Sequence, residues 1–310
     1  MTRLVFAIPS KGRLKDNAEA WLGGCGFRLR QRGGARGYTA DLDGLPQVDV
    51  RLLSAREIAE GLISGAIHVG VTGEDLLNDL SPDLARDAAT LRPLGFGRAD
   101  MVVAVPKAWL DVANMADLEA AGARFRARHG RRFRVATKYL NMTRRFFAEK
   151  SVGEYRLVES AGATEAAPAA GSADLIVDIT STGATLEANH LKILDDGVIL
   201  RSQAVLAGSL HAHWDNPARE ALAAFLDSVE ARAAARDLRR LTAQAPIDPA
   251  LADQIGLTDL TGHTAFCDAQ KAANAARMLC DQGLGPVTVD TVDFIFRSGN
   301  ATIESFFGKF

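Results

Sequence analysis

The sequence predicts an α/β protein with two lobes around a central cleft, followed by a small α+β extension at its carboxyl end. Short apolar, β-branched runs alternate along the chain with stretches of helical periodicity, which is typical of α/β folds. Several of these runs end in polar, glycine-containing turns, where open α/β sheets bind ligands. The strand pattern leaves a first unit near Arg98 and returns to it near Lys192, so two lobes flank a cleft.

Composition sets the class of protein. The 310 residues are 47% hydrophobic and 24% charged, so the chain can bury a sizeable core and divide into two or three domains. The formal net charge of −2 argues against a nucleic-acid binder. The three cysteines, an odd number without CxxC spacing, predict neither a disulfide framework nor a thiolate metal site.

Apolar runs are short throughout the chain. None approaches the ~20 residues that a membrane-spanning helix needs. The apolar segment before Pro9 is also shorter than the core of a secretory signal, which takes about 7–15 residues. We therefore expect a cytoplasmic protein with no membrane or nucleic-acid partner.

The first lobe opens with a buried strand at residues 4–8, followed by a helix whose apolar residues recur at helical spacing from Leu14 to Leu22. The turn between them consists of Ser10, Lys11, Gly12 and Arg13. Two cations and a glycine at the carboxyl end of a strand suit a polyphosphate. The alternative is a solvated basic loop.

A strand, helix and strand follow over residues 48–73. Ser54 and Glu57 have the spacing of a capping box, which predicts a helix start. The next strand ends at Gly73 in a second polar turn. His68 lies inside that strand pattern, so we expect it to pack in the core rather than bind a ligand.

The second lobe is predicted from glycine punctuation near Arg98 and a new apolar strand at 101–105. A helix near 115–122, a strand at 132–138 and a helix at 141–152 follow. Lys138 lies where that strand gives way to its helix, which makes it a candidate to bind phosphate. Arg144 and Arg145 are either part of the same site or solvated charges.

The stretch from 173 to 186 carries the strongest signal for chemistry. A buried strand at 175–179 is interrupted by Asp178 and ends in a turn made of Thr180, Ser181, Thr182, Gly183, Ala184 and Thr185. A helix start leaves backbone N–H groups unpaired and favours anions, while glycine allows close approach and hydroxyls add donors. Asp178 could hold ribose hydroxyls or a phosphate-bound Mg²⁺. Simple helix capping is the alternative.

These residues resemble the phosphoribosyl-pyrophosphate (PRPP) loop of phosphoribosyltransferases, in which an acid at a strand end precedes a TGxT turn. The longer string GATEAAPAAGSADLIVDITSTGATLEANHLKIL is similar to the signature of the ATP phosphoribosyltransferase family, which opens histidine biosynthesis. The strings IPSKGRL and RVATKYLNMTRRFFAEK resemble the same family.

The resemblance implies that N1 of the adenine of ATP displaces pyrophosphate from PRPP, with Mg²⁺, to give phosphoribosyl-ATP. The turn at 180–185 would hold the ribose 5-phosphate and Asp178 the ribose hydroxyls. Asp178, Lys11 and Arg13 would have catalytic roles. The residues expected to hold ATP or polyphosphate are Ser10, Lys11, Gly12, Arg13, Gly73 and Lys138. Glu159 and Glu165 are candidates to orient the ribose or the metal, and no fixed protein metal site is expected.

Two alternatives to this enzyme remain. The predicted lobes are periplasmic-binding-protein-like, and such a fold also serves non-catalytic binding of an anionic metabolite. The TGxT turn and the lack of a signal-peptide pattern argue against that function. A catalytically silent regulatory partner should have lost Asp178 or the loop hydroxyls, and both are present.

The predicted boundaries place residues 1–97 and 192–230 in the first lobe, 98–191 in the second, and 231–310 in the extension. Asn216 and Pro217 predict the start of a helix that reaches about residue 241. Before it, His211 and His213 have HxH spacing, but no third ligand lies nearby, so we do not expect a metal site.

The extension is predicted to contain a helix at 266–280 and strands at 287–296 and 302–307. Long-form members of the family end in a regulatory βαββαβ domain that senses histidine, whereas short forms depend on a separate regulatory subunit. The extension has the length of that domain but fewer predicted strands, so it is either a diverged regulatory domain, with histidine as feedback inhibitor, or an oligomerisation unit. We expect a homo-oligomer. Its aromatic residues should pack on the lobes or on another subunit, and these are Phe294, Phe296, Phe306 and Phe307.

Overall fold

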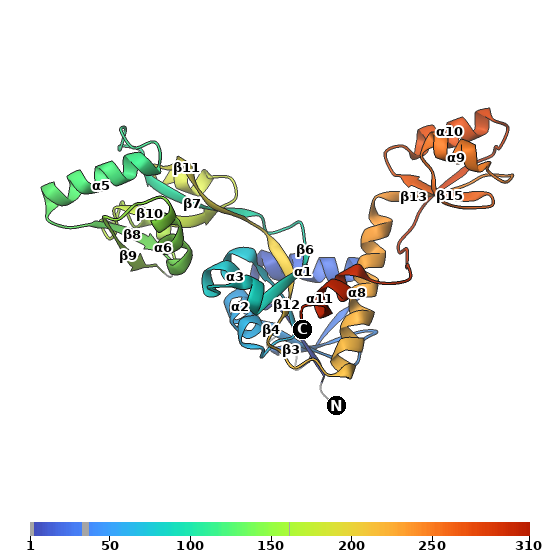
Figure 1. Cartoon of the computed structure of the whole chain (residues 1–310), viewed down its shortest axis with the longest axis horizontal. Coiled ribbons are helices and arrows are strands. Elements are labelled where there is room, and N and C mark those ends of the chain that lie inside the picture. The colour runs from blue at the N-terminus through green and yellow to red at the C-terminus, as the bar shows by residue number, and fades with distance from the viewer. Residues whose placement is uncertain (1–2, 33–36, 161) are drawn as a thin grey trace.

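The computed structural model describes residues 3–32, 37–160 and 162–310. Its strands form sheets of seven, five and four strands, which lie in three separate units (Figure 1). The first two are lobe I and lobe II, and the third is the carboxyl-terminal domain. The predicted two-lobed α/β core is therefore confirmed. In the described part of the chain, no helix is long and apolar enough to cross a membrane.

Lobe I is built on the seven-stranded sheet. Its strands, in spatial order, are β2 (Leu29–Arg32), β3 (Thr39–Leu42), β4 (Val48–Leu53), β1 (Leu4–Pro9), β5 (Val69–Gly73), β12 (Ala204–Ser209) and β6 (Ala88–Pro93). Strands β4, β1 and β5 are parallel, so their carboxyl ends meet at one edge. Alternate β1 side chains enter different cores: Phe6 joins the α1 and α8 side, and Ala7 joins the α2 side.

The helices of lobe I start where local chemistry allows. They are α1 (Gly12–Gly24), α2 (Ala55–Ser64), α3 (Glu74–Leu80), α4 (Leu84–Asp87) and α8 (Asn216–Arg236). The capping box of α2 is confirmed, because Glu57 N donates to Ser54 Oγ and Ser54 N to Glu57 Oε2. In α8 the cap is Asp215 rather than Asn216, and the helix ends five residues before its predicted end because a strand follows.

Lobe II carries the five-stranded sheet. Its strands, in spatial order, are β11 (Leu191–Ser202), β7 (Ala99–Pro106), β10 (Leu175–Thr180), β8 (Phe133–Thr137) and β9 (Tyr155–Glu159). Its helices are α5 (Met115–His129), α6 (Leu140–Glu149) and α7 (Ala184–Ala188), with a 3₁₀ turn at Thr164–Ala166. Strand β11 pairs with β7 as far as Ser202, so the chain returns to lobe I at Gln203 and not near Lys192.

The carboxyl-terminal domain has more strands than the sequence predicted. Its elements are β13 (Leu238–Thr242), α9 (Pro249–Ile255), β14 (Thr258–Thr261), β15 (Thr264–Asp268), α10 (Ala272–Asp281) and β16 (Thr288–Thr291). This βαββαβ order forms an antiparallel sheet, β14-β15-β13-β16. Strands β14 and β16 read TDLT and TVDT and are mostly exposed, so they lack an apolar signal.

The last residues return to lobe I. The predicted strand at 302–307 is instead a helix, α11 (Ala301–Phe307), which lies beside α8 (Figure 1). Asn300 caps this helix through Ile303 N, and Phe306, which is 2% exposed, joins the lobe I core. The expected packing of Phe306 on a catalytic lobe is therefore confirmed, whereas Phe296 is 65% exposed.

Candidate active site

A cavity of about 480 Å³ lies between the two lobes. Arg13 and Gly73 line it from the carboxyl ends of β1 and β5, and Lys138 and Ser181 line it from those of β8 and β10. Parallel strands therefore bring predicted site residues from distant parts of the sequence to one cleft.

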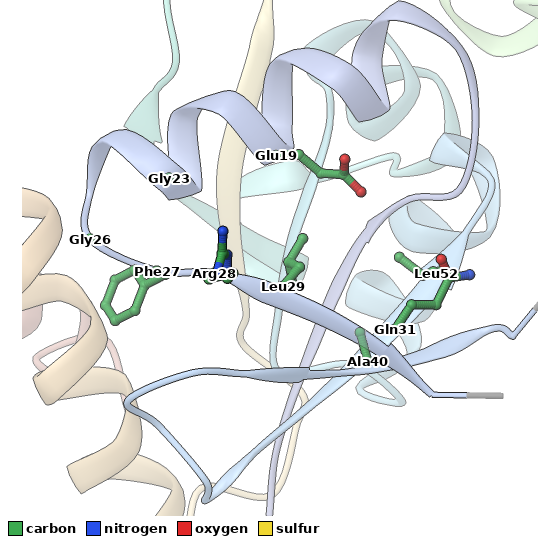
Figure 2. Close-up of a pocket in the computed structure, with 9 residues that line it drawn as sticks. All are labelled: Glu19, Gly23, Gly26, Phe27, Arg28, Leu29, Gln31, Ala40 and Leu52. Carbon is green, nitrogen blue, oxygen red and sulfur yellow. The ribbon is translucent and has the colours of Figure 1, made fainter. Parts of the chain in front are cut away.

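A second hollow, of about 460 Å³, lies beside the end of α1 on the outer strands of lobe I (Figure 2). Its lining includes Glu19 from α1, Arg28 and Leu29 near β2, and Leu52 from β4. None of the predicted site residues lines this hollow. The inter-lobe cavity is therefore the better candidate for the active site.

The turn after β1 presents unpaired donors. Helix α1 starts at Gly12, its cap residue Lys11 makes no side-chain capping bond, and its first turn carries no acid. The N–H groups of that turn are thus available to an anion. Lys11 and Arg13 are exposed, and Gly12 has φ of +74°, a conformation that glycine adopts without strain. Of the four predicted residues in this turn, Arg13 lines the cavity.

Gly73 ends β5 at the floor of the cleft. A Cβ at this position would lie 2.2 Å from Asp75 Oδ1. A side chain here would push the Asp75 carboxylate out of its position, so the glycine leaves room for that buried acid.

The turn at 180–185 is shaped by its own hydroxyls. Thr180 Oγ1 accepts from Gly183 N at 2.9 Å, and Thr182 Oγ1 accepts from Ala184 N at 3.4 Å. Ser181 Oγ donates to the carbonyl of Arg98 at 3.0 Å, which ties the turn to the lobe crossing. Thr185 and Ala184 are exposed. These bonds hold the turn open ahead of any ligand.

Asp178 is half-buried at the end of β10. Burial raises the pKa of its carboxyl group, while the Ile179 amide and the Lys138 cation oppose that rise. The negative charge of Glu165 raises the pKa further, and the buried Thr164 hydroxyl lowers it. Lys138 and Glu165 therefore both act on the Asp178 carboxyl group. Glu159 is exposed at the end of β9, which is separated from β10 by β8.

The residues after Lys138 have mixed roles. Lys138 Nζ lies 4.8 Å from the centre of the Tyr139 ring. Thr143 is buried and donates to the Tyr139 carbonyl at 2.6 Å, and Arg144 donates to Asn141 Oδ1 at 3.1 Å. Arg145 donates to the Ser81 carbonyl of lobe I at 3.1 Å. Of this group, Lys138 is the one that lines the cleft with its cation.

Three buried residues near the cleft are not among the site residues predicted from the sequence, and these are Asp75, Asp79 and Tyr139. Tyr139 Oη donates to Asp75 Oδ2 at 2.5 Å, and Asp79 Oδ1 accepts from the N–H groups of Asn141 and Met142. The signal that could have revealed them is the pair of acids four residues apart in EDLLNDL, directly after the turn at Gly73.

The histidines serve structure. His68 is 6% exposed, accepts from Val5 N at 3.2 Å and donates to the His213 carbonyl at 3.0 Å, and burial lowers its pKa. The prediction of a core histidine is confirmed. His211 bonds Asp87 at 3.0 Å. Among the described residues, no three His, Cys, Asp or Glu side chains are grouped so as to hold a metal.

Comparison with known proteins identifies the family of this chain. A model of the HisG family, described as ATP phosphoribosyltransferase, matches residues 54–231. An ATP phosphoribosyltransferase of Caulobacter vibrioides (strain NA1000 / CB15N) is 53% identical over 310 residues, which cover 98% of this chain and 97% of the relative. The chain belongs to the ATP phosphoribosyltransferase family.

Other relatives support this assignment. The enzyme of the same name from Nitrobacter winogradskyi is 46% identical over 98% of this chain and 97% of its own. A solved structure described as the ATP phosphoribosyl transferase (HisG:HisZ) complex from Thermotoga maritima superposes with a TM-score of 0.57 at 25% identity. It covers 73% of this chain and 96% of that chain. The family and the transferase function predicted from the sequence are confirmed.

Proposed function

We propose that the inter-lobe cleft of this ATP phosphoribosyltransferase joins the phosphoribosyl group of PRPP to N1 of the adenine of ATP and releases pyrophosphate, the first step of histidine biosynthesis. The observation that supports this most directly is the opposition of two anion-binding turns across one cavity. Arg13 and the α1 start face it from lobe I, and Lys138 and Ser181 face it from lobe II. Both substrates are polyanions, which this arrangement suits.

Within the cleft, we assign PRPP to lobe II. The exposed turn at 180–185 would hold the 5-phosphate, and Asp178 would accept hydrogen bonds from the ribose hydroxyls. ATP and the polyphosphate groups would lie against Ser10, Lys11, Gly12, Arg13, Gly73 and Lys138. Adenine N1 is a poor nucleophile, so catalysis would depend on alignment and on stabilisation of the departing pyrophosphate.

Mg²⁺ fits this chemistry. The ion binds through one or two carboxylates together with substrate phosphates and keeps several waters, so it needs no cage of protein ligands. Asp178 and Glu165 lie close enough to influence each other's charge and would supply such carboxylates. When bound, the ion would neutralise charge on the pyrophosphate.

The carboxyl-terminal domain is the proposed regulatory unit. Its βαββαβ order is the one that the resemblance to long-form members implies, and these sense histidine. We therefore propose histidine as a feedback inhibitor and a cytoplasmic homo-oligomer as the working form. A separate regulatory subunit is the alternative, because the Thermotoga maritima structure is described as a HisG:HisZ complex.

A pyrophosphate-release assay tests the catalytic proposal. Release should require ATP, PRPP and Mg²⁺ together, because each substrate pairs with a different lobe. Tight binding of both anions without turnover would overturn it in favour of a binding protein.

Regulation is tested by excising the domain while keeping α11. Ile295 N donates to the Ala231 carbonyl at 2.9 Å, so the two ends of the domain lie close together and a short glycine-rich linker can join residue 237 to residue 292. The excised protein should retain turnover and lose inhibition by histidine. Unchanged inhibition would place the histidine site elsewhere.

A further inference from the structure

Buried polar side chains join the two lobes beneath the cleft. Asp75 and Asp79 lie one turn apart on α3 of lobe I and are 8% and 4% exposed. Tyr139, between β8 and α6 of lobe II, is 1% exposed. Polar groups buried this deeply are costly unless they are hydrogen-bonded, and here their partners lie on the opposite lobe or at the crossing.

Asp75 holds two segments at once. Tyr139 Oη donates to its Oδ2 at 2.5 Å, within the short range of hydrogen bonds to an ionised acceptor. Ser202 Oγ donates to its Oδ1 at 3.1 Å, and Asp75 N donates to Ser202 Oγ. Because Ser202 ends β11, Asp75 binds lobe II and the strand that returns from it. Burial first, and then the charge of Asp75, raise the pKa of Tyr139, so its hydroxyl remains a donor.

Asp79 supplies the cap that α6 lacks. Its cap residue, Tyr139, makes no side-chain capping bond, and Asp79 Oδ1 accepts from Asn141 N at 3.0 Å and Met142 N at 2.9 Å. A carboxylate is favourable at that end of the helix dipole. In return, Arg145 of α6 donates to the carbonyls of Asn78 and Ser81, which flank Asp79 at the carboxyl-terminal end of α3. The two helices therefore satisfy each other's unpaired backbone groups.

This arrangement bears directly on the cleft. Gly73 immediately precedes α3, and Lys138 immediately precedes Tyr139, and both line the cavity. The chain crosses between lobes near residues 98 and 203, and paired crossings of this kind are where domains hinge. Whatever fixes α3 against α6 therefore also fixes the two halves of the site relative to each other.

We propose that α3 is a clasp that sets the angle between the lobes, and that Tyr139, acting through Asp75, is a positioning residue that aligns the bound donor with the acceptor. The inference rests on the proposed division of the substrates between the lobes. It differs from a ligand-driven hinge, because the contacts that define the arrangement of the lobes lie within the protein.

Tyr139→Phe tests the clasp kinetically, since it removes one hydroxyl and keeps the ring. We expect kcat to fall about 10- to 100-fold, because small misplacements of reacting groups cost that much. The KM values for ATP and PRPP should change little, since the substitution alters none of the residues assigned to bind either substrate. Tyr155→Phe is the matched control, because this ring packs on Phe147 within lobe II, and it should leave kcat unchanged.

The distance between the lobes provides a second measurement, which a simple loss of stability would not change. Spin labels would be placed by Glu60→Cys on α2 and Arg128→Cys on α5, both exposed, with Cys280→Ser removing the exposed native thiol. Pulsed electron paramagnetic resonance should give a narrow distribution of distances between the two labels, and Tyr139→Phe should broaden it.

Asp79→Ala provides a second variant if Tyr139→Phe does not fold, because it removes the acceptor of the Asn141 and Met142 N–H groups. The same broadening and loss of kcat are expected. A fall in kcat without broadening, or broadening without a fall in kcat, would overturn the clasp. If the unsubstituted protein itself releases no pyrophosphate, the proposed function fails instead, and the distance measurement still tests whether α3 holds the lobes.

Discussion

Phe306 should contribute strongly to the stability of lobe I, although only four residues follow it in the sequence. Its ring packs against Trp214, with centroids 5.3 Å apart, and against Phe307 and Phe310. It also lies over Gly208 of β12, where an added Cβ would meet it at 2.7 Å. Phe306→Ala removes this ring from the lobe I core, and such changes cost about 3–5 kcal/mol.

Thermal unfolding followed by circular dichroism measures this effect. For a unit of this size each kcal/mol shifts Tm by about 2–4 °C, so Phe306→Ala should lower Tm by about 6–20 °C. Phe296→Ala is the matched control, because that ring is 65% exposed and most exposed substitutions change stability by less than about 0.5 kcal/mol. Equal melting temperatures for the two variants would refute the packing of α11 on lobe I. By the same reasoning, truncation near Leu241 should destabilise the catalytic core as well as remove the domain.

Three further predictions follow from single side chains. Asp178→Asn and Thr185→Val should each lower kcat/KM for PRPP about 10- to 100-fold, because a hydrogen bond to a charged group is worth about 1.5–3 kcal/mol. Unchanged steady-state kinetics in both variants would contradict the assignment of PRPP to the 180–185 turn. Burial raises the pKa of Asp174, but hydrogen bonds from Arg131 and Arg134 outweigh it and hold that pKa at about 2. Because the pKa of Asp174 is lower in the folded protein, its contribution to the free energy of unfolding is present above its unfolded pKa of about 3.9 and is lost as pH falls towards 2. When the free energy of unfolding is measured as a function of pH, Asp174→Asn should therefore lose less stability in acid than the unsubstituted protein. Burial raises the pKa of the Cys25 thiol to about 11, although the charges of Arg92 and Arg232 oppose the rise. Iodoacetamide at neutral pH should therefore label the exposed Cys280 first and Cys25 only after unfolding. Mass spectrometry of the peptides would show the order of labelling.

The turns around the cleft could be predicted from sequence because their signals are local. Arg13, Lys138 and Ser181 each follow a strand and Gly73 ends one, and the carboxyl ends of parallel strands share an edge. Residue order alone therefore placed them in one cleft. The resemblance of the 162–194 string to one family then supplied the reaction, which the relatives confirm.

The carboxyl-terminal domain could not be predicted as well. Strands β14 and β16 have four residues each and are mostly polar, because the sheet buries one face against α9 and α10. The apolar residues of α11, Ile303, Phe306 and Phe307, follow helical spacing, but the segment is short enough to resemble a strand. Likewise, β11 contains the residues DDG, which are typical of a turn. The strand nevertheless pairs with β7 as far as Ser202, with shifts in register, and so remains in lobe II.

The sequence by itself determined the class of fold, the position of each turn at the cleft and the family, since all three depend on residues near one another in the chain. Tertiary structure alone decided how the lobes are joined. Tyr139 and Asp75 are 64 residues apart, and nothing in the neighbourhood of either shows that one donates to the other. The α6 helix has no cap in its own sequence and is capped from α3, and Phe306 completes a core that begins at the amino terminus. Buried polar groups must find partners, but only packing determines which part of the chain supplies them.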